Sequence, residues 1–345
     1  MEGISYRRAA AAMGVRVSVI TPVYNMEETI EASARSVLGQ TFADLELICV
    51  DDGSTDRTGA ILDRLAQEDP RLKVIHQQNR GVSAARNAGL AAAAGETVAW
   101  LDGDDQMGPQ ALEKLNAALL ETGASMAICN YENVERSGAR EKRYVQRPNE
   151  VISGEEALTR VLRREITQSL CFNLAPRAFY RDVTFPEGML FEDVRSSYKL
   201  YEQAKTVTLV NDSLLFSRLV RAESISHAAT IEKRAASCEA YLIRQRDLTS
   251  RRPETEAVFV RSNYASLLLR LRAAVLRDSR ASFAANRAVI RDVCGYFRAR
   301  TKLALGENAG MGKRLEYRLL TQGTRAGFFL SRVVSAGRRG GTWLR

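Results

Sequence analysis

Polar residues that could do chemistry gather directly after apolar runs in the first third of this 345-residue chain. Three of these clusters are Thr21–Asn25, Asp51–Ser54 and Asp102–Asp105, and a fourth, between residues 79 and 87, contains Arg86. Asp and Asn also end strands and cap helices, so each cluster taken alone has a purely structural explanation. The repetition of such clusters favours one shared site that works through carboxylates.

The most informative cluster is Asp102-Gly103-Asp104, which is followed directly by Asp105. Hard divalent ions prefer carboxylate oxygens, and Mg²⁺ is commonly held by one or two carboxylates while substrate phosphates complete its shell. Gly103 allows the backbone to approach a ligand closely, because it has no side chain. The spacing of a calcium-binding EF-hand is absent. The cluster therefore predicts a Mg²⁺ or Mn²⁺ site beside a phosphorylated substrate.

A second acidic pair, Glu192-Asp193, follows the apolar residues 189–191 and precedes a helical stretch. A carboxylate in this position could take a proton from a reacting hydroxyl as a general base. Asp is also a favoured residue at the N-terminus of a helix. The residues alone leave both interpretations open.

Short runs of β-branched residues alternate with helix-length stretches between residues 16 and 130. The runs are Val17–Ile20, Leu45–Val50, Leu72–Ile75, Thr97–Leu101 and Met126–Cys129. The stretches between them are Glu27–Leu38, Asp56–Glu68, Val82–Ala93 and Pro109–Leu120. This alternation predicts an α/β fold with a parallel sheet covered by helices. Ligands bind at the carboxyl ends of such strands, so the polar clusters are expected to converge there.

The pattern changes twice after residue 130. Residues Glu132–Glu150 are polar and charged, and we expect a loop or excursion there. A second patterned region continues to about Arg221, and from about Ile231 the apolar spacing becomes helical. We therefore expect an N-terminal extension (1–15), an α/β domain (16–230) and a helical C-terminal region (231–345).

Composition excludes several classes of protein. Hydrophobic residues make up 45% and charged residues 26%, which is ordinary for a globular chain. No apolar run approaches the roughly 20 residues of a transmembrane helix, and the run at 9–13 is too short for a secretory signal. The glycine-rich motifs of dinucleotide dehydrogenases and P-loop ATPases are absent.

Cysteine and histidine usage favours a cytosolic protein that does not depend on either residue for catalysis. The five cysteines are odd in number, widely spaced and form no CxxC pair, which suits reduced thiols. Two histidines are too few to favour a histidine-based zinc site or a Ser–His–Asp relay. His76 is interpreted as a strand-end residue.

Positive charge is concentrated in the C-terminal third. Residues 231–345 carry 24 Lys and Arg against 9 Asp and Glu, whereas residues 1–230 carry 26 against 32. This excess predicts an anionic partner. Four arginines recur every seven residues beside apolar residues: Arg318, Arg325, Arg332 and Arg339. On a single helix this pattern is typical of attachment to an anionic membrane surface. The alternatives are a helix packed on the catalytic domain and a polyanion-binding surface, but no specific nucleic-acid motif is present.

Four segments together resemble the family 2 glycosyltransferases, which are inverting, nucleotide-sugar-dependent enzymes. They read VSVITPVYN, TFADLELICVDDGSTDRT, NRGVSAARNAGL and VAWLDGDD, and shorter matches follow in GMLFEDV and LLFSRLVRAESIS. The resemblance implies a GT-A type, Rossmann-like, mostly parallel sheet flanked by helices. It further implies a nucleotide half at about 16–130 and an acceptor half at about 131–230, and it does not extend into the basic helical C-terminal region.

The resemblance also implies roles for individual residues. It assigns the donor nucleotide to residues that follow the strands: Pro22, Val23, Tyr24, Asp51, Asp52, Arg86, Asp102 and Gly103. Among these, Asp51 would accept a hydrogen bond from the base, and Arg86 would lie near the base or the diphosphate. The metal falls to Asp104, with Asp102 and Asp105 sharing that duty.

On the acceptor side, the resemblance implies that Asp193 is the catalytic base and Glu192 its orienting partner. Ser196-Ser197 stand where an aromatic residue is common in the family, which leaves the acceptor open. The expected reaction is transfer from a UDP-sugar to a hydroxyl of a glycan or lipid-linked acceptor in surface polysaccharide assembly. The alternatives are a nucleotide-sugar-binding protein without catalysis and a polyanion-binding protein. We expect a cytoplasmic location, with peripheral attachment to the membrane.

Overall fold

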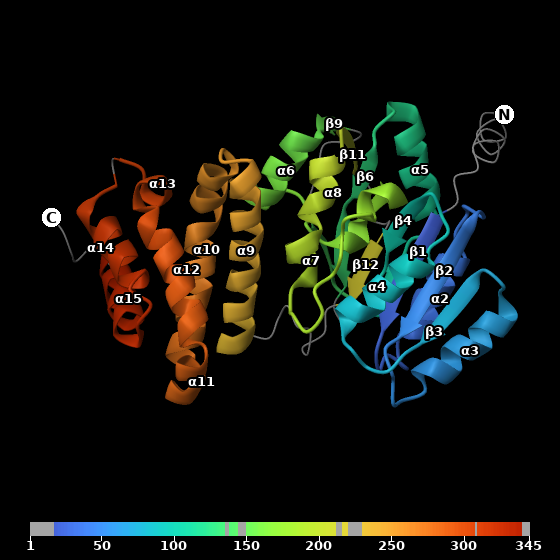
Figure 1. Cartoon of the computed structure of the whole chain (residues 1–345), viewed down its shortest axis with the longest axis horizontal. Helices are drawn as coiled ribbons and strands as arrows, with labels where there is room; N and C mark the ends of the chain where they lie inside the picture. Colours follow the sequence, from blue (N-terminus) through green and yellow to red (C-terminus); the bar gives the residue numbers. More distant parts are fainter. Residues whose placement is uncertain are drawn as a thin grey trace. The chain divides into compact units, whose positions relative to one another are not determined.

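The computed structural model describes residues 17–134, 138–143, 150–211, 216–219, 230–307 and 309–339 (Figure 1). The expected N-terminal extension, residues 1–15, lies outside these residues. The chain divides into two compact units. The first consists of Met1–Val161 and Ile166–Arg221, and the second of Leu162–Glu165 and Ala222–Arg345. Each unit is described by itself below.

The five expected strands are all present in the first unit. They are β1 (Val17–Val23), β2 (Leu45–Asp51), β3 (Leu72–His76), β4 (Thr97–Trp100) and β6 (Met126–Cys129). With β9 (Glu150–Ser153), β10 (Asn173–Pro176) and β11 (Thr206–Val210) they form an eight-stranded sheet in the order β3-β2-β1-β4-β10-β6-β11-β9. The pairs β1–β2, β2–β3, β1–β4 and β6–β11 are parallel, whereas β9 and β10 run antiparallel to their neighbours. The mixed α/β class and the mostly parallel sheet are confirmed.

The expected helices also form, between the strands. They are α2 (Ile30–Leu38), α3 (Thr58–Glu68), α4 (Val82–Ala92) and α5 (Ala111–Thr122). Strands β1 and β2 are buried at every position, as expected for strands covered on both faces. Helix α4 packs closely on β1, because a Cβ placed on Gly89 would lie 2.4 Å from Cγ2 of Ile20. A side chain at Gly89 would therefore push α4 off the sheet.

The region Glu132–Glu150, expected as a loop or excursion, contributes strands. Strand β7 (Tyr131–Val134) pairs antiparallel with β8 (Arg140–Arg143), and both belong to a second sheet in the order β5-β12-β7-β8. Its other members are β5 (Asp105–Met107) and β12 (Phe216–Leu219). Backbone pairing needs no apolar side chains, so this polar hairpin carries none of the alternation by which strands are predicted.

Short elements complete the first unit around the sheet. They are α6 (Gly154–Arg163), η1 (Leu170–Phe172), η2 (Arg177–Tyr180), α7 (Glu192–Ser196) and α8 (Tyr198–Gln203). The last residues of α6 fall in the segment assigned to the second unit.

The second unit is helical from Ile231 onward, as predicted. Its elements are α9 (Ile231–Arg251), α10 (Thr255–Arg277), α11 (Arg280–Ala285), α12 (Arg287–Ala299), α13 (Thr301–Leu305), α14 (Met311–Leu320) and α15 (Arg325–Arg339). Phe259, Phe297 and Phe328 are fully buried and form part of its core. Among the helices that the structure describes, none is long and apolar enough to cross a bilayer.

A continuous stripe from Arg318 to Arg339 would require one helix, and the structure has two helices there instead. Gly323, at a φ of +68°, lies in the break between α14 and α15. A positive φ is readily adopted by glycine and ends helices, so the seven-residue repeat is divided between two helices. The side chain of Arg339 lies outside the described residues.

Candidate active site at the ends of the parallel strands

Three parallel strands end next to one another and bring the polar clusters to one edge of the sheet. Val23 of β1 pairs with Asp51 of β2, and Ile20 of β1 pairs with Trp100 of β4. The backbone N–H of Asp52 donates to the carbonyl of Val23 over 2.9 Å, so the pairing continues into the loops. The sequence-based expectation that the clusters converge is met by this register.

The loop after β1 is tied to the loop after β2. Asn25, in the left-handed region at a φ of +51°, donates its backbone N–H to Ser54 Oγ over 3.0 Å. Its side-chain oxygen accepts from the Thr55 backbone N–H over 2.8 Å. Pro22 and Val23 are buried within β1, whereas Tyr24 is 44% exposed. Tyr24 therefore presents an accessible aromatic ring from a firmly held loop.

Asp51 is nearly buried and its carboxylate is held from two sides. One oxygen accepts from the Ser54 backbone N–H over 2.9 Å, and the other lies 3.0 Å from His76 Nδ1. The second ring nitrogen of His76 lies 2.9 Å from Asp63 Oδ1. The hydrogen bond to Asp63, reinforced by the one to Asp51, raises the pKa of His76 above its ordinary value. The interpretation of His76 as a strand-end residue is confirmed, and its ring also positions Asp51.

Asp52 organises the loop that leads into α4. It is buried, and one oxygen accepts from Gln77 Nε2 over 2.6 Å and from the Arg80 backbone N–H over 2.9 Å. The other oxygen accepts from the Gly81 backbone N–H over 2.7 Å. All three donors belong to the loop at residues 77–81. Asp52 therefore fixes the conformation of this loop beside the site.

Arg86 connects two acidic clusters that are far apart in the sequence. Its buried guanidinium donates to Asp102 Oδ1 over 3.1 Å and forms a close ion pair with Glu192. It also lies 6.0 Å from the centre of the Phe185 ring. Its Nε, although buried, has no hydrogen-bond partner. The structure therefore places Arg86 between the strand-end acids and the Glu192-Asp193 pair.

Two further contacts hold the segment before Glu192 against α4 and its preceding loop. The Asn87 side chain and the Phe185 backbone exchange two hydrogen bonds of 2.9 Å each. Arg80 forms an ion pair with Glu187, in which Nη2 donates to both carboxylate oxygens at 2.9 and 3.0 Å. Sequence reasoning placed Asn87 in a polar cluster without giving it a role, and it missed Phe185 and Glu187. Only the proximity of Asn87 to Arg86 within one segment could have pointed to a role for Asn87.

Glu192 and Asp193 lie in the first turn of α7. Phe191 occupies the N-cap position, but Asp193 is an acid in the first turn, so its interpretation as a helix N-terminal residue stays open. Phe191 has a φ of +60°, a left-handed conformation that costs a residue with a side chain about 1–3 kcal/mol. Asp193 Oδ1 accepts from the Val194 backbone N–H over 2.7 Å. The side chain of Asp193 is half-buried, whereas that of Glu192 is held inside by Arg86.

The three acids after β4 differ in accessibility. The Asp102 side chain is 31% exposed and Asp104 is half-buried, whereas Asp105 is 2% exposed at the start of β5. Within the described ranges, no group of three or more His, Cys, Asp or Glu side chains is arranged to hold a metal ion. One or two carboxylates suffice for Mg²⁺ when substrate phosphates complete the shell. The oxygen donors of Asp102 and Asp104 fit such an ion.

Gly103 lies in close contact with the loop after β1, since a Cβ at this position would meet the sulfur of Met26 at 2.7 Å. The segment at 224–227, which belongs to the resemblance, lies outside the described residues, as does Arg221. Arg218 lies on β12, where its backbone is paired with Asp105.

Comparison with known proteins identifies similar sequences. The family model described as Glycosyl transferase family 2 matches residues 18–184. GlyG, a glycosyltransferase of Streptococcus pneumoniae, is 31% identical over 60% of this chain and 71% of GlyG. The putative teichuronic acid biosynthesis glycosyltransferase TuaG of Bacillus subtilis is 31% identical over 59% of this chain and 79% of TuaG. The chain spans from about a third to 60% of the length of several other curated glycosyltransferases.

Among solved structures, residues 1–349 of S. aureus TarS in complex with UDP share the fold. The TM-score is 0.71 with 20% sequence identity, over 96% of this chain and 93% of that structure. The likeness supports the arrangement of a GT-A sheet followed by a helical region.

Proposed function

Since this chain belongs to glycosyl transferase family 2 and is a glycosyltransferase, we propose that it transfers a sugar, with inversion, from a UDP-sugar to a hydroxyl of a glycan or lipid-linked acceptor. The UDP bound to TarS supports the choice of nucleotide. The name of TuaG, which refers to teichuronic acid biosynthesis, supports a role in cell-surface polysaccharide assembly.

In this proposal the donor binds at the strand ends of the first unit, in a nucleotide half at about 16–130. Pro22, Val23 and Tyr24 line the base, with the exposed ring of Tyr24 available for stacking. Asp51 accepts from a ring N–H of the base. A carboxylate has about four lone-pair sites, and Ser54 and His76 leave some of those on Asp51 unused.

Asp102 and Asp104 hold a Mg²⁺ or Mn²⁺ ion in this proposal, which when bound neutralises the charge of the diphosphate leaving group. Asp105 is nearly buried on β5, and its backbone N–H closes this acidic turn by donating to the Asp102 carbonyl over 2.9 Å. Arg86 adds a fixed positive charge beside Asp102. With the leaving group stabilised by charge, the reaction needs no acid to protonate it.

Asp193 acts as the base on the acceptor side, in the half at about 131–230. The acceptor oxygen forms a bond to the anomeric carbon while the bond from that carbon to the diphosphate oxygen breaks. The electron pair leaves with the diphosphate, and the hydroxyl proton passes to the Asp193 carboxylate. Glu192 orients this turn through its ion pair with Arg86.

The observation that carries the proposal is the Arg86 bridge. One buried guanidinium holds Asp102, beside the expected metal, and Glu192, beside the expected base. The donor-side and acceptor-side acids are therefore parts of one connected site. A cytoplasmic location is included in the proposal, since all five cysteines are free and buried, as suits a reducing compartment.

A thermal-shift screen of nucleoside diphosphates, each with Mn²⁺ and with EDTA, tests this function. We expect UDP to raise the melting temperature most, and only with the metal. Transfer is then followed with the matching UDP-sugars and simple glycan acceptors. Equal stabilisation by all nucleotides, or UDP binding of the same strength in EDTA, contradicts the donor and metal assignments respectively.

A further inference from the structure

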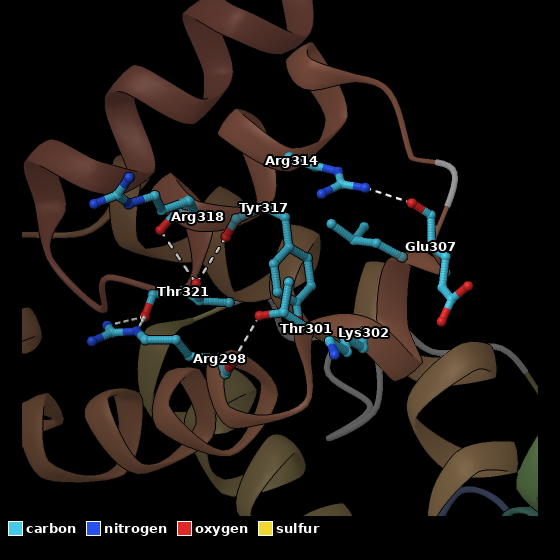
Figure 2. Close-up of a pocket in the computed structure, with 10 residues that line it drawn as sticks. Arg298, Thr301, Lys302, Glu307, Arg314, Tyr317, Arg318 and Thr321 are labelled. Atoms are coloured by element: carbon cyan, nitrogen blue, oxygen red, sulfur yellow. Dashed lines mark hydrogen bonds between the residues drawn. The ribbon is translucent and has the colours of Figure 1, made fainter.

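The second unit contains a cavity of about 500 Å³ next to α12, α13 and α14 (Figure 2). This volume lies in the range of about 300–1,000 Å³ that is usual for small-molecule sites. Four basic residues line it, namely Arg298, Lys302, Arg314 and Arg318, together with a single acid, Glu307. Part of the positive charge of the C-terminal third therefore lines this cavity.

Within the described part of the chain, the four basic residues are not paired with acids, unlike several other arginines of this unit. Arg246 pairs with Asp292 at 2.7 Å, and Arg300 pairs with Glu256 at 2.7 Å. Arg298, Lys302, Arg314 and Arg318 form no ion pair with any residue that the structure describes. Because like charges placed together repel, such a cluster is most stable when an anion from outside occupies it.

Two of the basic side chains are held in place by backbone carbonyls. Arg298 Nε donates to the carbonyl of Thr321 over 3.0 Å. Arg314 donates to the carbonyls of Ala309 and Glu307 over 2.7 and 2.5 Å, and the second of these bonds is drawn in Figure 2. A guanidinium has five N–H donors, so each arginine retains donors for a ligand. Carbonyls fix these cations without neutralising them.

The cavity also has an apolar side. The Tyr317 hydroxyl donates to the carbonyl of Phe297, which leaves the ring to form a wall together with Leu305. On the neighbouring face of α14, Met311 is 73% exposed and Leu315 is 47% exposed. Residues three and four apart lie side by side on a helix, so this apolar pair borders Arg314 and Arg318.

We propose that this cavity binds the phosphate headgroup of an anionic membrane lipid, while Met311 and Leu315 enter the interfacial layer of the bilayer. Charge complementarity selects the phosphate, and the adjoining apolar residues select a bilayer over a free ion. Phe329, Leu330 and Val333 on α15 are also about half exposed and can add to the contact. The binding does not depend on the proposed sugar transfer, but it would bring the enzyme to the surface where lipid-linked acceptors reside.

Co-sedimentation of the full chain with vesicles tests the site. We expect binding to phosphatidylglycerol–phosphatidylcholine vesicles at low salt and none to pure phosphatidylcholine. The double variant Lys302→Glu with Arg318→Glu is expected to bind about tenfold more weakly or worse, since each basic residue contributes about 1 kcal/mol at such a surface. The matched control is Arg261→Glu with Arg287→Glu, which changes the charge equally at exposed helical positions outside the cavity.

The control is expected to bind within about twofold of the natural chain. Equal loss in both double variants would mean that the whole basic surface attracts lipid, and the cavity proposal would be wrong. Failure of the natural chain to bind anionic vesicles, or vesicle-independent binding of RNA homopolymers through the same residues, would also overturn it. UDP-dependent thermal shifts, recorded on every variant, report separately on the fold and on the proposed donor site.

A second variant separates a lipid from a soluble phosphate. Met311→Ser with Leu315→Ser removes apolar area while it keeps all four basic residues. We expect it to weaken vesicle binding severalfold and to leave the weak binding of glycerol phosphate, measured by calorimetry, unchanged. If this variant binds vesicles as the natural chain does, and glycerol phosphate binds tightly by itself, the ligand is a soluble phosphate and the membrane proposal fails.

Discussion

The strand-end site of the first unit and the cavity of the second unit treat charge in opposite ways. At the strand ends, Arg86 lies between two carboxylates, Asp51 contacts His76, and Asp52 accepts three hydrogen bonds. Four basic residues line the cavity together with one acid, Glu307, with which none of them forms an ion pair. Charges that are compensated within the chain fix a geometry, whereas charges left uncompensated attract a ligand. The first pattern suits a site that must hold reacting groups, and the second suits attachment.

The sharpest test of the first pattern is Asp193→Asn. Asparagine keeps the shape of the side chain but cannot accept the proton of the acceptor hydroxyl. We expect transfer to fall by about 10²–10⁴-fold, the usual contribution of a general base, while UDP affinity stays the same. Initial rates and UDP calorimetry measure the two effects. Retention of more than about a tenth of the natural rate would exclude Asp193 as the base.

The next largest effect is expected for Asp104→Ala. Removal of one of two accessible carboxylates weakens the metal site, so the Mn²⁺-dependent part of UDP affinity should disappear. Turnover should drop by about 100-fold, because a bound metal ion contributes several kcal/mol to transition-state stabilisation. UDP titrations in Mn²⁺ and in EDTA measure it. Glu121→Gln, an exposed acid on α5, is the matched control. An unchanged metal dependence in Asp104→Ala would show that other residues bind the metal.

Arg86→Met tests whether internal compensation is what holds the first site together. The change leaves Glu192 buried without its cation, and breaking a buried ion pair in this way costs roughly 3–5 kcal/mol of unfolding free energy. Adding Glu192→Gln removes the stranded charge and should recover part of that loss. Urea unfolding of the two variants measures both steps. If the second substitution recovers nothing, the pair does not contribute to stability in this way.

The smallest expected effect concerns His76. The hydrogen bonds to Asp63 and to Asp51 raise the pKa of His76 above its ordinary value of 6.5. Protonated His76 therefore stabilises the fold fully below pH 6.5, and this contribution is lost as the pH rises through the higher value of the folded state. An NMR titration of the imidazole gives that pKa directly. His76→Asn should lessen the pH dependence of unfolding, and a titration midpoint below 6.5 would contradict the prediction.

Sequence patterns predicted the parallel core well because β1, β2, β4 and β6 are buried at every position and the helices between the strands carry apolar stripes. They did not predict β7 and β8, whose polar residues pair through the backbone. The seven-residue spacing of Arg318 and Arg325 would put them on one stripe of a single helix, but Gly323 adopts a left-handed conformation between them. The spacing of side chains gives no sign that one residue, Gly323, lies in the break between two helices.

The sequence predicted which residues belong to the candidate site better than it predicted the contacts between them. The acids at Asp102 and Glu192 stand out by type and position, yet no pattern links either to Arg86. Residues 86 and 192 are brought together by the fold of the intervening chain, through the Asn87–Phe185 clamp and the Arg80–Glu187 ion pair. Such contacts depend on three-dimensional packing and have no local signature.

The left-handed backbone of Phe191 places a limit on how the protein can be improved by engineering or by natural drift. Phe191→Gly would relieve the strain of about 1–3 kcal/mol and could raise the melting temperature. The same change would loosen the turn that carries Glu192 and Asp193, because glycine permits many other conformations there. With Asp193 as the proposed base, stability and the placement of that base make opposite demands on this one position, and a screen that rewards heat resistance alone would select against sugar transfer.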